Sequence, residues 1–154
     1  KGVLRAAKES DGWLVSSRST LPTIGVQAPQ YRQAVKEAGK PGYIAAWREV
    51  FVAESKQQAI DIIRPQVEWL YKDRASLGHS QELPEADRID VSFEQVLEGR
   101  FIIGSPEECI DEIHKYKDLG VEELILRSQW PGMESEVTDR SLRIFAEKVM
   151  PEFV

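Results

Sequence analysis

Arg127, Gln129, Trp130 and Met133 lie in a short stretch, RSQWPGM, that directly follows the apolar run 124–126. An apolar run of this kind predicts a buried strand. Arginine and glutamine side chains donate hydrogen bonds, and the Pro-Gly dipeptide predicts a turn that holds the tryptophan and the methionine beside them. The stretch therefore predicts a ligand-facing wall. Two plainer interpretations stay open: the tryptophan, exposed by its spacing, only covers a helix end, or the arginine pairs with a nearby acid.

The other residues that could do chemistry do not predict a metal centre or a nucleophile. His79 and His114 have no second histidine or cysteine at ligand spacing, so we expect no metal ligands. Cys109, the only cysteine, falls at an apolar helical position that is typical of a core residue. Gly104 and Ser105 resemble a minimal anion site at a helix start, although helix capping explains them equally well.

A regular order of elements positions these residues: one helix, then four repeats of a strand followed by a helix. Ser105 with Glu108, and Ser55 with Gln58, have the spacing of capping boxes. Expected helices cover residues 2–9, 31–38, 56–71, 106–119 and 136–150. Residues 11–15 are expected to form a turn followed by a short strand, and further strands are expected over 47–53, 101–103 and 123–127. We expect residues 16–29 to form a loop and residues 75–95 a polar insertion with one short helix over 92–98.

Arg48 and Glu49 begin the second expected strand. The amino ends of parallel strands form the side of such a fold that serves stability rather than catalysis. We therefore expect these two residues to take part in a structural ion pair.

Short apolar strands that each precede an amphipathic helix predict an α/β fold with parallel strands, in one domain over residues 1–154. One solution is a doubly wound sheet, which the lack of a Gly-rich dinucleotide fingerprint or P-loop makes less favoured. The other is half of a (β/α)8 TIM barrel, since eight units take about 250 residues. In a barrel, the stretch after the last strand lies at the ligand-binding end.

Composition limits the partners of the chain. Its 154 residues are 42% hydrophobic and 30% charged, which is typical of a globular protein, and the net charge of −6 argues against a nucleic-acid partner. No apolar run approaches the roughly 20 residues that cross a bilayer, so no membrane partner is expected. The single cysteine indicates a reducing compartment, and we expect the cytoplasm.

Several blocks, taken together and in order, resemble a known family. AAKESDGWL, WREVFVAES, GSPEECIDEIHKYKDLGVEELILRSQWPGM and SLRIFAEKVMP resemble the C-terminal half of the bacterial luciferase-like flavin-dependent monooxygenases. The resemblance covers nearly the whole chain except residues 75–95. It implies the closing half of a TIM barrel, with reduced FMN or a deazaflavin as cofactor and a small organic substrate and O2 as reactants.

The resemblance also implies site residues. Flavin contacts are implied for Lys1 and Gly2, the remnants of a phosphate loop at the start of the chain, and for Ser16, Ser17 and Arg18 after the first strand. Substrate-pocket contacts are implied for Trp13, Arg127, Gln129, Trp130 and Met133. The catalytic side chains of the family lie mostly in the other half of the barrel, so no catalytic residue is assigned.

Two expectations about the state of the chain follow. The sequence starts Lys-Gly-Val without an initiator methionine, which indicates a processed, cloned or proteolysed start. We expect the isolated chain to be inactive, because catalysis needs groups from both barrel halves. Its partner would be the N-terminal barrel half. The alternative is a non-catalytic half-barrel module that pairs with a copy of itself to cover its open sheet edges.

Overall fold

The computed structural model describes residues 2–81 and 83–154. Its elements follow the expected order of one helix and four strand-helix repeats. They are α1 (Gly2–Glu9), β1 (Trp13–Val15), α2 (Leu21–Glu37), β2 (Ile44–Val52), α3 (Lys56–Ser76), η1 (Glu85–Asp87), α4 (Phe93–Leu97), β3 (Phe101–Gly104), α5 (Pro106–Asp118), β4 (Glu123–Arg127), α6 (Ser135–Ile144), η2 (Phe145–Val149) and η3 (Met150–Glu152). The parallel α/β class is therefore confirmed.

Local sequence signals explain where several helices begin. The Ser105 hydroxyl accepts from the backbone of Glu108, whose side chain accepts in return from the Ser105 backbone, and Pro106 occupies the first turn of α5. The Ser92 capping box starts α4 in the same way, with Gln95 as its partner. Each cap satisfies backbone donors that a helix leaves without acceptors at its first turn.

The expected loop over 16–29 is wrong, because most of it belongs to α2. Pro22 occupies the first turn of this helix, where a missing N–H costs nothing, and Pro29 lies inside it. Ile24, Ala28 and Tyr31 are buried and recur at helical spacing. Burial of this apolar face outweighs the low helix propensity of the prolines and glycine that suggested a loop.

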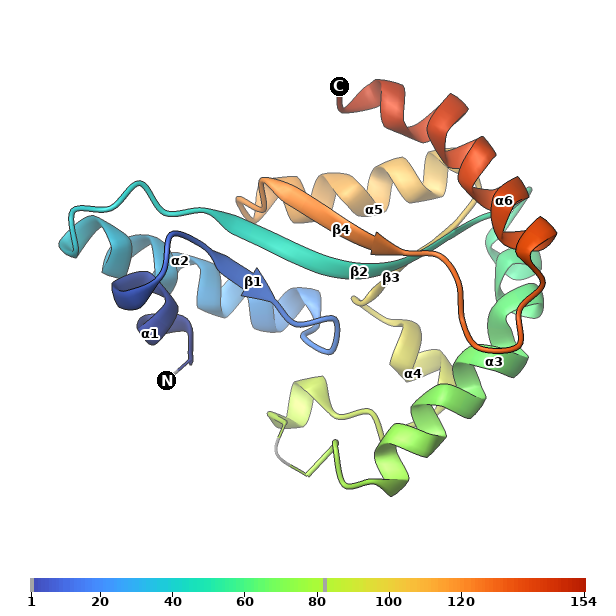
Figure 1. The fold of residues 1–154 in the computed structure, drawn as a ribbon, viewed down its shortest axis with the longest axis horizontal. Coiled ribbons are helices and arrows are strands. Elements are labelled where there is room, and N and C mark those ends of the chain that lie inside the picture. Colours follow the sequence, from blue (N-terminus) through green and yellow to red (C-terminus); the bar gives the residue numbers. More distant parts are fainter. Residues whose placement is uncertain (1, 82) are drawn as a thin grey trace.

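The four strands form one parallel sheet around β2, and the strands do not follow one another in chain order. β1 pairs with residues 44–46 of β2, β3 pairs with residues 49–52, and β4 pairs with residues 45–49. The residues of β2 that pair with β4 include residues that also pair with β1 and with β3. Since one edge of a strand can pair with only one neighbour at each residue, β1 and β3 must share the opposite edge of β2. Figure 1 shows β4 and β1 on the two sides of β2, with α3 crossing the carboxyl ends of the strands. Within the described residues, no strand pairs with the outer edge of β4 or of β1.

Two apolar clusters lie on the two faces of this sheet. The larger one includes Ile44, Ala46, Val50 and Val52 of β2, packed against α1, α2, α5 and η2. The smaller one joins Phe51 to α3, α4, β3 and Trp130 near the carboxyl ends. Only part of the second face is covered. The rest of this face is called the open face here; it consists of Leu14, Trp47, Ile125 and Arg127, which are at least partly exposed, and the buried Ala45 and Glu49 between them, and the parallel register brings these residues side by side.

The open face exposes large apolar side chains. Leu14 is 55% exposed, Ile125 is 44% exposed and Trp47 is 39% exposed. The expectation of a fully buried last strand is therefore wrong for Ile125, although Leu124 and Leu126 pack on the larger cluster. In a barrel, helices cover one face of the sheet and the other face lines the interior. The open face has the character of such an interior without its second half.

Candidate active site

A cavity of about 620 Å³ lies at the carboxyl end of β1, beside the middle of β2, and we call it the strand-end cavity. This volume is in the range of small-molecule sites, roughly 300–1,000 Å³. The segment after β1, one residue of β2, and the end of α3 with the residues that follow it form the walls. The lining residues are Ser16, Ser17, Arg18, Trp47, Arg74, Leu77, Gly78, His79 and Leu83.

Two buried arginines hold the backbone of the segment after β1. Arg48 Nη1 donates to the Ser16 carbonyl at 2.9 Å, and Arg100 Nε donates to the Arg18 carbonyl at 2.7 Å. Arg48 is 0% exposed and Arg100 is 1% exposed. Burial lowers the pKa of both guanidinium groups, and no carboxylate of the described residues bonds to either. These bonds fix the backbone that presents Ser16, Ser17 and Arg18 to the cavity.

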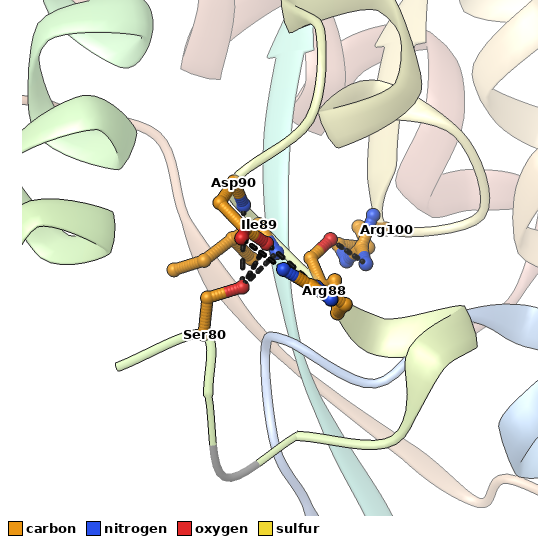
Figure 2. A network of polar contacts seen from close by, with 5 residues as sticks. All are labelled: Ser80, Arg88, Ile89, Asp90 and Arg100. Atoms are coloured by element: carbon orange, nitrogen blue, oxygen red, sulfur yellow. Dashed lines mark hydrogen bonds and ion pairs between the residues drawn. The ribbon is translucent and has the colours of Figure 1, made fainter. Parts of the chain in front are cut away.

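Arg100 also organises the insertion that forms the other wall. Its guanidinium donates to the carbonyl oxygens of Gln95 at 3.1 Å, Val96 at 3.2 Å and Arg88 at 3.1 Å. Figure 2 shows the contact with Arg88 and, next to it, the cluster in which Ser80 and Arg88 bond to the Asp90 carboxylate. One side chain thus joins the insertion to the segment after β1.

The Asp90 carboxylate links residues within the insertion to one another. Arg88 and Ser80 both donate to it, and these hydrogen bonds, the arginine first, hold the pKa of Asp90 well below its usual range. The Ser80 hydroxyl in turn accepts from the backbone N–H of Ile89 at 3.1 Å. The segment between α3 and α4 is therefore tied together by polar contacts close to the cavity wall.

The expected ion pair of the second strand exists with a different partner. Arg48 and Glu49 are neighbours on a strand, so their side chains point to opposite faces, and Glu49 pairs with Arg127 of β4. Arg127 Nε donates to Glu49 Oε2 at 2.7 Å, and a second bond joins Arg127 Nη2 to Glu49 Oε1. Glu49 lies in the middle of β2 rather than at its beginning as expected, and it is in register with Arg127, the last residue of β4. Arg127 therefore matches the plainer interpretation, a pair with an acid, although Glu49 is 0% exposed rather than on the surface.

Aromatic groups surround this ion pair. The hydroxyl of Tyr71 lies 3.4 Å from Glu49, and burial, followed by the Glu49 charge, raises the pKa of Tyr71. Burial by itself would lower the pKa of Arg127. The hydrogen bond to Glu49 and the charge of Glu49 outweigh this effect, so the pKa is raised. The Arg127 guanidinium carbon is 5.7 Å from the Trp47 ring centroid, within cation–π range. The pair is therefore connected to the cavity wall through Trp47.

The RSQWPGM stretch forms the expected turn, but its tryptophan points inward. Met133 N donates to the Trp130 carbonyl at 3.1 Å, and Gly132 has a φ of 84°, which suits glycine at that position of a tight turn. Trp130 is 2% exposed and stacks on Phe101 with centroids 6.3 Å apart, so the expectation that it is exposed is wrong. The Pro-Gly turn returns the chain over the sheet end and buries the ring. Gln129 is exposed, and Met133 packs against the same cluster.

The remaining implied residues lie apart from the cavity lining. Trp13 is buried and packs on Tyr31 of α2 with ring centroids 5.6 Å apart. Gly2 is exposed at the start of α1, and Lys1 lies outside the described residues. The structure therefore brings Ser16, Ser17 and Arg18 together in one cavity. It does not bring all the implied flavin contacts and substrate contacts together on one surface.

Sequence reasoning missed six residues of the cavity wall: Trp47, Arg74, Leu77, Gly78, His79 and Leu83. Trp47 belongs to an expected strand, and alternation could have placed it on the face opposite Arg48. No local signal shows that the end of α3 turns back toward β1.

Two further classes of site are not seen among residues 2–81 and 83–154. No group of three or more histidine, cysteine, aspartate or glutamate side chains there is arranged to hold a metal ion. No helix in that part of the chain has the length and apolar character needed to cross a membrane.

Comparison with known proteins shows to which family the chain belongs. The family model described as "Luciferase-like monooxygenase" matches residues 1–123. The chain belongs to the luciferase-like monooxygenase family. A comparison with curated proteins finds no match.

Solved structures of this fold extend well beyond the chain. Monooxygenase RslO1 from Streptomyces bottropensis is 20% identical, with a TM-score of 0.78 over 99% of this chain and 45% of its own. The oxygenating constituent of 3,6-diketocamphane monooxygenase from Pseudomonas putida, in complex with FMN, is 17% identical, with a TM-score of 0.70 over 99% and 45%. The coenzyme F420-dependent tetrahydromethanopterin reductase from Methanopyrus kandleri is 18% identical, with a TM-score of 0.68 over 99% and 48%. This luciferase-like chain spans less than half the length of each.

Proposed function

We propose that the chain is the C-terminal part of a luciferase-like flavin-dependent monooxygenase or oxidoreductase and supplies walls of the flavin and substrate pocket. The observation that carries this proposal is the strand-end cavity, because the segment that follows the carboxyl end of β1 lines it, and barrel enzymes bind their ligands at the carboxyl ends of their strands. Ser16, Ser17 and Arg18 line it, held by Arg48 and Arg100.

The donors in this wall fit a flavin or a deazaflavin. Both cofactors have a ring edge rich in oxygen and nitrogen, and serine hydroxyls and a guanidinium group can bond to such an edge. Gly2, at the start of α1, would lie near the phosphate, because helix N-termini favour anions. A bound flavin supplies hydride or oxygen chemistry that no side chain of this chain provides. The side chains of this half would bind and orient the cofactor and the substrate and shield them from water.

Either cofactor agrees with the solved structures of this fold, one of which contains FMN and another of which uses coenzyme F420. A small organic substrate would complete the reaction, with O2 as co-substrate in a monooxygenase. We expect the isolated chain to be inactive, and the cytoplasmic location expected from the single cysteine stays a prediction.

The partner would be an N-terminal half-barrel. The open face exposes Leu14, Trp47 and Ile125, and the outer edge of β4 has no strand partner among the described residues. Unpaired strand edges and exposed apolar side chains of this kind are normally covered by another part of the protein.

The test uses the protein made from the complete natural coding sequence that contains residues 1–154. Fluorescence titrations with FMN and with coenzyme F420 should show tight binding of one of them, and Arg18→Gln should weaken that binding relative to the exposed control Arg140→Gln. If neither cofactor binds this protein, or if both variants bind alike, the proposed role of the cavity wall is wrong.

A second candidate is a non-catalytic half-barrel that pairs with itself. The same open face and open edges favour it, because two copies could close a sheet of eight strands with two-fold symmetry. Sedimentation velocity on residues 1–154 should then give a dimer that Ile125→Glu converts to a monomer. A wild-type monomer that melts sharply and reversibly would contradict this candidate.

A further inference from the structure

The strand-end cavity has a charge that differs from that of the chain. The sequence contains 26 acidic and 20 basic residues, yet the described residues that line this cavity include two arginines and a histidine and no carboxylate. Arg18 comes from the segment after β1, Arg74 from the last turn of α3, and His79 from the insertion. Three separate parts of the chain therefore bring basic side chains to one cavity.

The two arginines are not engaged elsewhere. Among the described residues, no hydrogen bond or ion pair joins the guanidinium of Arg18 or Arg74 to another side chain or carbonyl group. The Arg74 guanidinium lies 5.8 Å from the Tyr71 ring centroid, at the outer limit of a cation–π contact. Both side chains are half-buried, so their donors are available to a ligand in partial shelter from water.

The other cavities differ in charge. One of about 790 Å³, between α4 and α5, is lined by Lys56, Arg88 and Lys115 but also by Glu94 and Glu112. One of about 710 Å³ along β4 is mainly apolar, lined by residues such as Leu124, Leu126 and Phe153. Among the three cavities, only the strand-end cavity therefore has basic side chains and no carboxylate among its described lining residues.

We propose that the strand-end cavity binds an organic substrate with an oxyanion group, held near His79 by Arg74 and by those of the five donors of Arg18 that do not bond to the cofactor. This inference rests on the proposed function and names the substrate class of the same site. The carboxylate, sulfonate or phosphate group receives the arginine donors, which suit such oxygens. The apolar part of the substrate lies against Trp47, Leu77 and Leu83, which line the same cavity. The phosphate of a flavin has the same chemistry, and the test separates the two sources.

The probes are octanoate and 1-octanol, which have the same chain length and differ in charge. Binding is measured by calorimetry on the protein from the complete coding sequence, with and without saturating FMN or coenzyme F420. We expect octanoate to bind at least about tenfold more tightly than 1-octanol, because a charged hydrogen bond contributes that much. Arg74→Gln should remove this preference and Arg74→Lys should restore part of it, whereas the control Arg140→Gln should keep it.

Four results decide the matter. Equal binding of both probes, or equal loss in Arg74→Gln and Arg140→Gln, overturns the anionic substrate while cofactor titrations leave the proposed function standing. Competition between octanoate and the cofactor assigns the basic cavity to the cofactor phosphate and also overturns it. Octanoate binding that depends on Arg74 without any cofactor binding keeps the anion site and removes the flavin function. Simultaneous binding of cofactor and octanoate supports both the flavin function and the anionic substrate.

Discussion

Replacing Arg100 with methionine tests whether one buried side chain holds the insertion to the segment after β1. In the wild-type chain its guanidinium donates to four carbonyl oxygens at 2.7–3.2 Å, those of Arg18, Gln95, Val96 and Arg88. A fifth acceptor, the carbonyl of Ala86 at 3.5 Å, is too distant to count as a full bond. Methionine fills a similar volume and donates nothing.

The expected loss follows from these four bonds. Each contributes about 1 kcal/mol net, and carbonyls left buried without a donor add to the loss, while methionine avoids the desolvation of a buried charge. We expect the free energy of unfolding to fall by about 3–5 kcal/mol. In a chain of this size that lowers Tm by roughly 10 °C.

Thermal unfolding by circular dichroism measures the change, with Arg140→Met as the exposed control. Hydrogen exchange locates it: protection should fall first in residues 83–97 and after β1, and only later in α5. Arg100→Lys should lie between the wild type and Arg100→Met, because lysine keeps the charge but not the planar fork. A Tm within about 2 °C of the wild type, or loss of protection spread evenly over the fold, would refute the reasoning.

Three further predictions concern single groups. Glu49→Gln leaves the half-buried Arg127 without a carboxylate and should cost about 2–4 kcal/mol in urea unfolding, most of which Glu49→Leu with Arg127→Leu should recover. Burial, and then nearby acids, raises the pKa of the Cys109 thiol to about 12, so a thiol reagent at about pH 8 should react only after unfolding, and fast native reaction would contradict this. The lowered pKa of Asp90 means that its contact with Arg88 is complete above about pH 4 and is lost as the pH falls through the lowered value. NMR shifts of residues 80–90 should follow this loss in the wild type but not in Asp90→Asn.

The sequence predicts the elements with local signals well and fails where distant parts meet. Ser105, Pro106 and Glu108 mark the start of α5 because every contact of that cap lies within one helical turn. The start of α2 was missed because Pro22, Gly25 and Pro29 suggest a loop, and only packing of the helix on the sheet outweighs them.

The candidate site shows the same division. Ser16, Ser17 and Arg18 could be proposed from the family resemblance, and they do line the cavity. Arg74 and His79 could not, because their approach to β1 depends on the path of the chain after α3. Trp130 was misplaced because the Pro-Gly turn predicts a reversal of the chain but not the face on which the ring ends.

The shared edge of β2 has a consequence for how the family can vary. β1 leaves this edge after residue 46 of β2, and β3 resumes it at residue 49. At the break, Arg48 Nη1 donates to its neighbour's carbonyl, that of Trp47, at 2.6 Å and to the Ser16 carbonyl, so a side chain takes the place of missing ladder donors. The register of β2 with β1 and β4 therefore does not depend on the length of the chain between α3 and β3. We therefore expect that segment to vary in length only where the carbonyls of Arg88, Gln95 and Val96 stay within reach of Arg100, so that the cavity wall diverges between these fixed points while the sheet stays constant.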